Sequence, residues 1–463
     1  MRDAPASPAL WWDGLERPPA EPPLETRECA DFAIVGGGYT GLWIAYFLKQ
    51  YRPDAAVILI DAQRVGHGAS GRNGGWLMGS LEGLERFAGK DGSLDGDVRR
   101  ELTELVSAAS TIINRERIDC DFVHGGCLAV AARYEQQSDR ARTALKHLHR
   151  LGFSNQDYHW LTPEEISQRV SVARPGGGFY TPHVARIQPA KLVLGLRAAV
   201  KRLGVRIFEH TRARSITTQH IQCDRGSIAA EHVVVATEGY SEAGNPLHRR
   251  LVPVQTGMVA TEPLTETQWR GIGLMQRETL ADFSRAATYL QRTADHRLII
   301  GARGHYHPGG LPKHSLEDSE AVVLQRQRIG HALLPQIKEV RFTHSWSGSV
   351  GVPRSFAPHI VFDPKSRLAT AGGYVGEGVG ASFLFGQTLA ELMTQQDTPR
   401  SRMPWVKRHR LTDLKRWETE PLPRWGFGAL MGLFHLEEKL LTGNKNGRLT
   451  QWVTRCCDWA SPH

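Results

Sequence analysis

The chain has 463 residues, of which 41% are hydrophobic and 23% charged, values typical of a soluble globular protein with two or three domains. It contains no run of about 18 apolar residues, so we expect no transmembrane helix, and its first residues lack the apolar core of a signal peptide. The cysteines have no metal-ligand spacing, which predicts no metal site and a reducing, cytoplasmic setting. They are Cys29, Cys120, Cys127, Cys223, Cys456 and Cys457.

The net charge of +9 is uneven along the chain. Residues 401–463 hold eleven Lys and Arg against six Asp and Glu, which gives this segment a charge of +5. Such a bias can indicate binding to nucleic acid or to an anionic surface. Because the chain has no basic motif interleaved with aromatic residues, we expect a solvated basic face and no nucleic-acid partner. An anionic substrate or a weak membrane-surface contact stays an alternative.

The first strong motif, GGGYTG, lies between a predicted buried strand over 32–35 and a predicted helix with apolar side chains at helical spacing. A Gly-x-Gly-x-x-Gly turn in this context is typical of a dinucleotide site. Gly36 would make the tight turn, Gly38 would let a pyrophosphate approach the backbone, and Gly41 would let the helix pack on the strand. The pyrophosphate would then lie at the positive end of the helix.

Asp61 supports the same interpretation. Twenty residues after Gly41, the apolar run 57–60 predicts a second buried strand that ends in this carboxylate. An acid at the end of the second strand is the group that hydrogen-bonds a ribose hydroxyl in such sites. An ordinary strand–turn–helix followed by a surface aspartate is the alternative.

Downstream, apolar spacing and turn residues predict an alternation of helices and strands. Residues 64–79 are dense in glycine and predict a loop that wraps something closely. Thr162 is the expected N-cap of a helix with Pro163 at its first position. The other expected elements are helix 81–115, strand or hairpin 121–131, helix 134–151, helix 189–203, strands 205–209 and 231–237, a strand-rich stretch 254–312, helix 315–334, strand 368–373 and helix 381–393.

Four motifs together resemble those of the FAD-dependent D-amino-acid oxidase superfamily, the group that includes glycine oxidase and sarcosine oxidase. They match that family in order and spacing over residues 29–396. The GASGRNGG form and the Pro-rich segment before the first strand are most similar to the γ-glutamylputrescine oxidase branch. The four motifs are GGGYTG with Asp61, GHGASGRNGG at 66–75, VVVATEGY at 233–240 and GGYVGEGVGASFLFGQTLAEL at 372–392.

The resemblance implies FAD as the cofactor. No cysteine lies between Cys223 and Cys456, so the cysteine–flavin link of sarcosine oxidase has no candidate there and we expect non-covalent FAD. The turn at 376–380 would place a positive helix end beside the flavin pyrimidine. The family usually has Glu where this chain has Asp61, and the shorter carboxylate can still reach a ribose hydroxyl. The residues expected to bind FAD are Gly36, Gly38, Thr40, Gly41, Asp61, Ser70, Arg72, Asn73, Gly74, Ala213, Ala236, Thr237, Gly376, Gly378 and Val379.

The expected fold class is α/β, with a Rossmann-like FAD-binding domain and an interleaved antiparallel-sheet substrate domain of α+β type. The expected segments are a Pro-rich N-terminal arm at 1–28, the FAD-binding domain at 29–121, 184–253 and 344–396, the substrate domain at 122–183 and 254–343, and a basic C-terminal extension at 397–463.

The substrate side is less informative, because flavin amine oxidation requires mainly that the C–H bond be held near the ring and the amine kept deprotonated. By resemblance, Arg292 corresponds roughly to the arginine with which family members hold a substrate carboxylate. Trp346 lies in the segment that runs past the flavin in the family. Tyr289 and His305 are further candidates from the same strand-rich part of the chain.

The electron acceptor stays open at this stage. Sarcosine-oxidase relatives keep an oxygen-activating lysine in a part of the chain where this sequence has none between Lys201 and Lys313. His305 or another cation could replace it, or the acceptor could be a quinone or a carrier protein.

The leading hypothesis is an FAD enzyme that oxidises a C–N bond of an amine or amino acid by hydride transfer to flavin N5, followed by imine hydrolysis and reduction of oxygen to hydrogen peroxide. A dehydrogenase that passes electrons to a quinone or carrier is the second. A non-catalytic nucleotide-binding interaction protein, with the basic, Trp-rich C-terminus as its surface, is the third. The candidate substrates are γ-glutamylated polyamines, N-methyl amino acids, D-amino acids and small aminophosphonates, and the arginines that favour an anionic group are Arg285, Arg292, Arg297 and Arg303.

Overall fold

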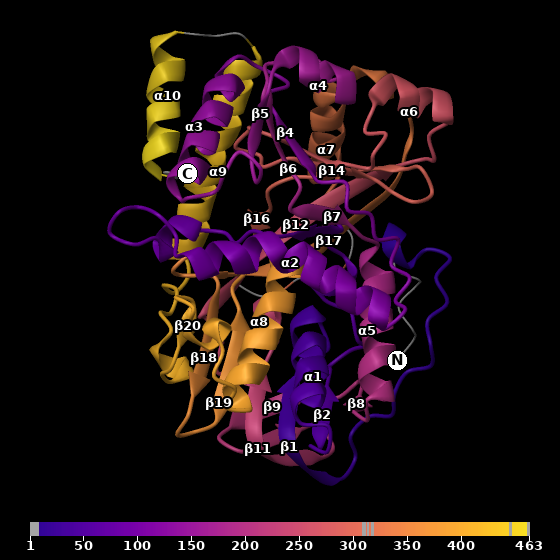
Figure 1. The fold of residues 1–463 in the computed structure, drawn as a ribbon, viewed down its shortest axis with the longest axis vertical. Helices are drawn as coiled ribbons and strands as arrows, with labels where there is room; N and C mark the ends of the chain where they lie inside the picture. Colours follow the sequence, from indigo (N-terminus) through magenta and orange to yellow (C-terminus); the bar gives the residue numbers. More distant parts are fainter. Residues whose placement is uncertain (1–8, 308–311, 313, 316–318, 444–446, 461–463) are drawn as a thin grey trace.

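The computed structural model describes residues 9–307, 312, 314, 315, 319–443 and 447–460, and two large sheets lie one above the other in it (Figure 1). We name them the lower sheet and the upper sheet after their places in Figure 1. The chain passes between the two halves several times, so each half is assembled from segments that are far apart in the sequence.

The lower sheet has a core of parallel, hydrophobic strands. Its strands are β1 (Arg27–Val35), β2 (Val57–Ile60), β8 (Arg206–Phe208), β9 (Ala213–Thr217), β10 (His220–Cys223), β11 (Ser227–Val235), β18 (His359–Asp363), β19 (Leu368–Gly372) and β20 (Val406–Lys407). Neighbours run in the order β20-β18-β19-β11-β1-β2-β8, and β1 pairs in parallel with both β11 and β2. All four residues of β2 are buried, as expected for a parallel strand that is covered on both faces.

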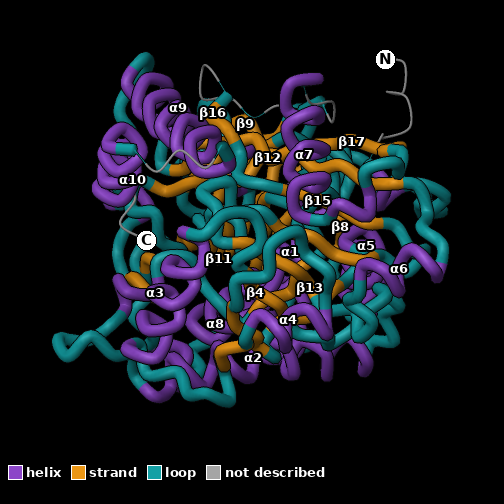
Figure 2. The backbone as a smooth tube through the Cα atoms, turned by 90° about the horizontal axis from the view of Figure 1, so that it is seen from above, coloured by secondary structure: helices purple, strands orange, loops and turns teal. Residues whose placement is uncertain are grey.

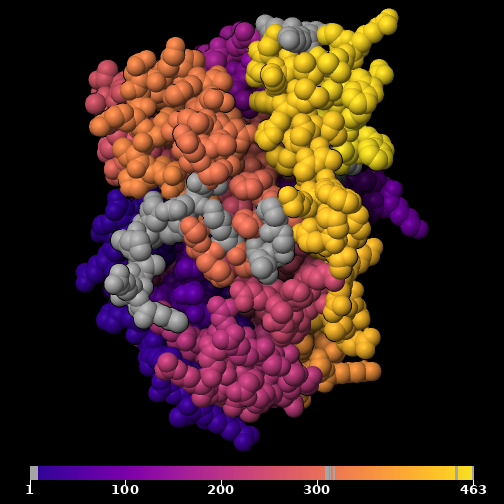
Figure 3. Space-filling view, turned by 180° about the vertical axis from the view of Figure 1, so that it is seen from behind, coloured from indigo at the N-terminus to yellow at the C-terminus, as the bar shows by residue number. Residues whose placement is uncertain are grey.

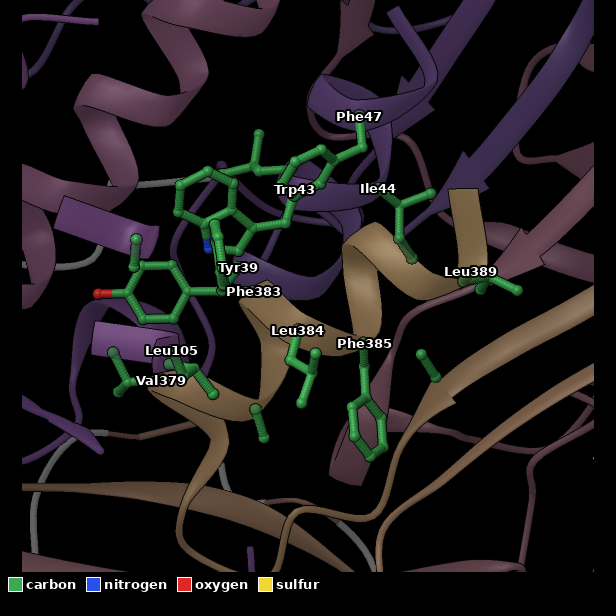
Figure 4. Packing of buried hydrophobic residues seen from close by; sticks show 14 of the residues in the cluster. Tyr39, Trp43, Ile44, Phe47, Leu105, Val379, Phe383, Leu384, Phe385 and Leu389 are labelled. Atoms are coloured by element: carbon green, nitrogen blue, oxygen red, sulfur yellow. The ribbon is translucent and has the colours of Figure 1, made fainter. Parts of the chain in front are cut away.

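Helices of the lower half join distant segments of the chain. They are α1 (Tyr39–Tyr51), α2 (Gly96–Arg115), α5 (Pro189–Arg202) and α8 (Gly378–Met393). Trp43 of α1 meets Phe383 of α8 edge-on, with 5.0 Å between the ring centroids (Figure 4). A Cβ atom at Gly386 would lie 2.7 Å from Trp43 Cβ, so glycine permits the close approach of the two helices. This packing places the first turn of α1 near the first turn of α8.

The upper sheet is mostly antiparallel. Its strands are β4 (Cys127–Val130), β5 (His159–Leu161), β6 (Gly178–Thr181), β12 (Leu251–Thr261), β13 (Thr279–Asp282), β14 (Tyr289–Arg292), β15 (Leu298–Gly301), β16 (His305–Tyr306) and β17 (Phe342–Pro353). Around it lie α3 (Gln136–Arg150), α4 (Pro163–Arg169), α6 (Glu266–Ile272) and α7 (Glu320–Leu333). Thr162 caps α4 and shares a capping box with Glu165, which confirms the predicted helix start.

A small antiparallel pair, β3 (Trp76–Met78) and β7 (Val184–Arg186), links the two halves. β3 contacts α2 and α8 of the lower half, and β7 contacts β13 of the upper sheet. Leu77 and Ala185 belong to the large hydrophobic core that includes α1 and α8 of the lower half. Because side chains alternate between the faces of a strand, Trp76 and Arg186 face the other way, toward the upper sheet.

Three predicted boundaries differ from the structure. β17 pairs with β12 along its whole length, so the chain returns to the lower sheet at β18 and not at residue 344. β20 pairs with β18, so the expected C-terminal extension begins inside the lower sheet. The helix expected over 81–115 begins at Gly96, because Asp95 caps it and glycines interrupt the preceding turn.

The short 3-10 helices are η1 (Leu10–Trp12), η2 (Ala69–Gly71), η3 (Leu84–Phe87), η4 (Glu238–Tyr240), η5 (Pro335–Ile337), η6 (Pro399–Arg402) and η7 (Leu411–Asp413).

The chain ends in two helices, α9 (Leu422–Thr442) and α10 (Arg448–Ala460), that lie side by side near α3 at one edge of the upper half (Figures 1 and 2). A small hydrophobic cluster that includes Phe434 and Val453 holds the two helices together. None of the described helices combines the length and apolar content needed to cross a membrane. Within the same residues, no group of three or more His, Cys, Asp or Glu side chains is placed to hold a metal ion.

Candidate active site

A deep cleft lies at the carboxyl ends of the parallel strands of the lower sheet, where open α/β sheets bind their ligands. Its walls come from the ends of β1, β2 and β11, the first turns of α1 and α8, and the loop 67–73. The empty space, open mouth included, is about 1500 Å³.

Two glycines of the GGGYTG turn are required by close backbone contacts. Gly36 has a φ of +116°, and a Cβ atom there would lie 2.4 Å from the carbonyl oxygen of Ala236 at the end of β11. A Cβ atom at Gly41 would lie 2.0 Å from the carbonyl oxygen of Gly36. Side chains at these positions would push apart the strand, the turn and the helix that together form the floor of the cleft.

Asp61 lines the cleft at the end of β2. Its carboxylate accepts hydrogen bonds from the backbone N–H groups of Gly37 and Gln63, both at 2.8 Å. These bonds fix the carboxylate and leave each oxygen a second lone pair for a ligand hydroxyl. Burial raises the pKa of Asp61 to about 6, although the two backbone donors act in the opposite direction.

Two helix N-termini, those of α1 and α8, line the cleft. Gly38 is the N-cap of α1 and Glu377 that of α8, and neither makes a side-chain capping bond. In α1, the N–H of Tyr39 donates to Ser70 Oγ at 2.9 Å, which ties the helix to the loop 67–73. Positive helix ends with unsatisfied amides favour negatively charged ligand groups. The arrangement suits a pyrophosphate at α1 and a developing negative charge at α8.

The loop 67–73 is held from outside the cleft by two tryptophans. Trp346 of β17 is fully buried and donates its indole N–H to the carbonyl oxygen of Arg72 at 2.8 Å. Trp11 donates to the carbonyl oxygen of Asn73 at 2.7 Å and meets Trp346 edge-on, at 6.0 Å between centroids. In the structure, Trp346 therefore supports the cofactor loop and does not line the cleft.

The structure brings most of the predicted cofactor residues together. Those that line the cleft are Gly36, Gly38, Thr40, Asp61, Ser70, Asn73, Ala213, Ala236, Thr237, Gly376, Gly378 and Val379. The remaining three, Gly41, Arg72 and Gly74, lie directly behind that wall. Arg72 is 2% exposed and its Nη2 lies 3.0 Å from His67 Nε2, a residue of the wall. Direct contact of each residue with a bound cofactor stays a prediction.

The predicted substrate residues are not brought together. Tyr289 packs on the glycine loop, because a Cβ atom at Gly74 would lie 2.6 Å from its ring. Arg292 lies three positions further along β14 and faces the opposite side of the sheet. Its guanidinium lies 4.5 Å from the ring centroid of Trp269 and its Nη2 lies 3.4 Å from Glu266 Oε2. His305 lies in β16, opposite Gln255. None of these residues lines the cleft.

A polar cluster that the sequence did not reveal lies between the β3/β7 pair and the upper sheet. Arg186 is 5% exposed, and its side chain has no hydrogen bond or ion pair with any described residue. Directly across the β3/β7 pair from Arg186, the Nε1 atom of Trp76 is buried without a partner. The Oε1 atom of Gln291 is also buried without a partner. Gln291 Nε2 donates to the carbonyl oxygen of Gly74, so the cluster borders the glycine loop. Arg186 Nε is a buried donor without a partner on a positively charged side chain, and such an atom suits an anionic ligand group.

Glu238 is a second residue that sequence reasoning missed. It has a left-handed φ of +46°, lines the cleft, and accepts a hydrogen bond from the N–H of Gly373 at 2.6 Å. Its Oε2 atom is buried without a partner, and burial raises the pKa of Glu238 to about 7. This carboxyl therefore joins η4 to the turn before α8. The contact between Glu238 and Gly373 leaves no signal in the sequence. The left-handed backbone of Glu238 is uncommon for a residue other than glycine.

Several buried carboxyls with raised pKa values predict a pH-dependent stability of the flavin-free protein. Burial raises the pKa of Glu377 to about 8 and that of Glu238 to about 7. The folded state binds more protons than the unfolded state between the ordinary glutamate pKa and these values, so the free energy of unfolding falls as the pH rises from 5 to 8. We expect a loss of about 3 kcal/mol per group over this range, since one pKa unit corresponds to about 1.4 kcal/mol.

Urea unfolding at a series of pH values measures this loss, and Glu238→Gln is expected to reduce the slope. Asp363→Asn is the matched control, because the hydrogen bond from Ser366 lowers the pKa of Asp363 and places its titration below this pH window. Equal slopes for the wild type and Glu238→Gln would contradict the assignment.

The residues present fit a flavin dinucleotide: an uncapped helix end for the pyrophosphate, a fixed carboxylate for a ribose and glycines that admit a close ligand. The model of the DAO family, FAD dependent oxidoreductase, matches residues 31–392. The chain belongs to this family. It is an FAD-dependent oxidoreductase, and its α/β fold is that of the family.

Relatives and solved structures agree with this assignment. The chain is 29% identical over 377 residues to "Gamma-glutamylputrescine oxidoreductase" of Escherichia coli (strain K12), which covers 78% of this chain and 83% of that protein. It is 28% identical over 410 residues to "Probable oxidoreductase OrdL" of Rhizobium meliloti (strain 1021), with coverage of 85% and 90%. The crystal structure of glycine oxidase from Geobacillus kaustophilus matches with a TM-score of 0.68 at 22% identity, over 83% of this chain and 100% of that chain. The structural likeness supports the fold.

Proposed function

We propose that this protein oxidises a C–N bond of a small amine or amino acid that carries an anionic group. The names of the relatives and of several structural neighbours share an amine or amino-acid substrate: γ-glutamylputrescine, glycine and, in a chain from Proteus vulgaris, L-amino acids. When bound, FAD supplies the acceptor for the hydride on the carbon next to nitrogen.

The observation that carries the anionic group is the unpaired guanidinium of Arg186. It lies in the layer between the β3/β7 pair and the upper sheet, beside the glycine loop that closes the cleft. Burial lowers the pKa of Arg186 to about 10; Arg277 and Arg292 act in the same direction and Asp121 acts against them. A carboxylate accepting from Arg186 Nε and Trp76 Nε1 would satisfy both orphaned donors at once. The proposal thus replaces Arg292 by Arg186 as the carboxylate anchor.

The chain's own residues then act by position. The loop that runs from Ser70 to Gly75 is held rigid by the indole N–H groups of Trp346 and Trp11, and Gln291 fixes its far end. A substrate anchored at Arg186 is thereby held in one orientation beside this loop, in a layer from which packed side chains exclude water. Orientation and desolvation are what such a reaction requires of the protein.

Oxygen is the proposed final electron acceptor, and a quinone or carrier protein is the second candidate. None of the described residues that line the cleft is a lysine, which favours the quinone or carrier protein. His67 lines the cleft, but burial lowers its pKa to about 3, so it carries no charge at neutral pH. His305, the substitute considered from the sequence, lies away from the cleft.

An anaerobic absorbance titration tests the proposed function. We expect γ-glutamylated amines or amino acids with a free carboxylate to bleach the flavin band, and matched amines without an anionic group to bleach it far more slowly. Readmission of air distinguishes the acceptors: rapid reoxidation with one peroxide per substrate supports oxygen, and slow reoxidation supports a carrier. A protein that holds flavin but is bleached by no amine would refute the proposal.

A further inference from the structure

The exposed hydrophobic residues of this protein are concentrated on the two C-terminal helices. Eight large apolar side chains are exposed among the described residues, and six of them lie on α9 and α10. All exposed tryptophans of that set are here, with exposed fractions of 64% for Trp425, 59% for Trp452 and 87% for Trp459. The two helices form an outer corner of the upper half, yellow in Figure 3. A patch of this kind marks a contact surface more often than a chance exposure.

The exposed apolar residues form one stripe on each helix, and the half-buried Cys456 lies within the stripe of α10. On α9, the positions 422, 425, 429, 432 and 436 hold Leu, Trp, Ala, Gly and Leu. On α10, the positions 449, 452, 456 and 459 hold Leu, Trp, Cys and Trp. Alternating steps of three and four residues keep each set on one face of its helix. The side of each helix that faces away from the stripe is buried, through Phe434 and Leu441 on α9 and Cys457 on α10.

The acidic groups of α9 and α10, the C-terminal hairpin, pair with arginines of the upper half. Glu437 pairs with Arg140 and Arg285, Glu438 pairs with Arg133, and Arg285 also binds Asp458. Glu437 is completely buried. The outer surface of the hairpin is therefore left without unpaired carboxylates among the described residues.

Basic side chains of the hairpin are directed outward. Arg424, Lys439, Arg448 and Arg455 are exposed, and none of them has an ion pair with a described residue. Arg448 and Arg455 are seven residues apart on α10 and lie beside the stripe that carries Trp452 and Trp459. The exposed surface thus combines tryptophan and leucine with unpaired positive charge.

We propose that α9 and α10 dock this protein on the surface of a membrane that contains anionic lipids. Interfacial helices have this composition, with Trp and Leu on one face and Lys or Arg beside them, and tryptophan favours the headgroup region. Anionic headgroups would neutralise the unpaired cations. A second copy of the chain would instead bring like charges together across the contact, which opposes association. The hairpin lies on the membrane and does not span it.

Flotation of the flavin-loaded, full-length protein with phosphatidylcholine vesicles, with and without phosphatidylglycerol, tests the proposal. We expect co-flotation with the anionic vesicles and its loss at high salt. Arg448→Gln and Arg455→Gln are each expected to weaken binding about fivefold, which corresponds to the roughly 1 kcal/mol of a basic residue near such a surface. The triple variant Trp425→Ser, Trp452→Ser, Trp459→Ser is expected to abolish flotation.

The matched control removes the two exposed apolar residues outside the hairpin. Met275→Ser with Leu324→Ser removes side chains that are 52% and 40% exposed and should leave flotation unchanged. All variants should keep their flavin content and melting temperature, because the replaced residues are exposed. Absence of binding to anionic vesicles at low salt would overturn the proposal. Binding that changes neither with the salt concentration nor with the arginine substitutions would also overturn it. If light scattering shows that the wild type is a dimer and the triple variant a monomer, and the wild type does not bind vesicles, the surface would be assigned to contact with a second copy of the chain.

Discussion

Replacement of Arg186 by methionine is expected to lower kcat/KM for an anionic amine substrate by about 10- to 150-fold while the protein becomes more stable. A charged hydrogen bond contributes about 1.5–3 kcal/mol, and 1.4 kcal/mol is a factor of ten, so loss of the anchor gives an effect of this size. The guanidinium is 5% exposed and unpaired in the ligand-free protein, so a methionine of similar length removes a buried charge. We expect the free energy of unfolding to rise by on the order of 1 kcal/mol.

Arg292→Met is the matched control, because Arg292 is equally buried but has partners. Its loss removes the contacts with Glu266, His296 and the face of Trp269, so we expect lower stability and a kcat/KM within about threefold of the wild type. Steady-state kinetics with and without the anionic group on the substrate, together with urea unfolding, measure both effects. If Arg292→Met loses the substrate and Arg186→Met does not, the anchor predicted from the sequence is the right one.

Gly41→Ala is expected to abolish flavin binding and to destabilise the fold by about 3 kcal/mol. The new Cβ atom would lie 2.0 Å from the carbonyl oxygen of Gly36, in the turn before the helix, and 3.2 Å from Ile34 Cγ2, on strand β1. Neither neighbour is the end of a flexible side chain, so the helix must move away from β1, at a cost near the upper end of measured overpacking. Movement of α1 displaces the helix end that would bind the pyrophosphate.

Gly271→Ala provides the control on α6, away from the cleft. A Cβ atom at Gly271 would meet no atom within 4 Å, so we expect the fold and the flavin content to be retained. The flavin-to-protein absorbance ratio and the melting temperature are the measurements. A Gly41→Ala protein that is purified with a full complement of flavin would show that the close approach of helix and strand is not required.

The residues expected to bind the cofactor were predicted from local signals in the sequence. GGGYTG, the acid at 61 and the turn at 376–380 were readable because a tight turn, a helix start and a strand end are each specified within a few residues. Thr162 was readable for the same reason, since a capping box depends on residues three apart. The β17 boundary was misplaced because a long strand that crosses from one predicted segment to the next has no break in its alternating pattern.

The sequence by itself determined that this chain is an α/β flavoprotein of its family, since the residues that meet the dinucleotide lie in short, contiguous motifs. The tertiary structure alone decided which side chains share the substrate layer. Arg292 and Gln291 are adjacent in the sequence, yet the strand turns them to opposite faces, and pairing of β3 with β7 brings Arg186 beside Trp76. Burial without a partner is a property of the packed molecule, so the unpaired guanidinium, the carboxyl of Glu238 and the outward stripes of α9 and α10 became visible with the fold.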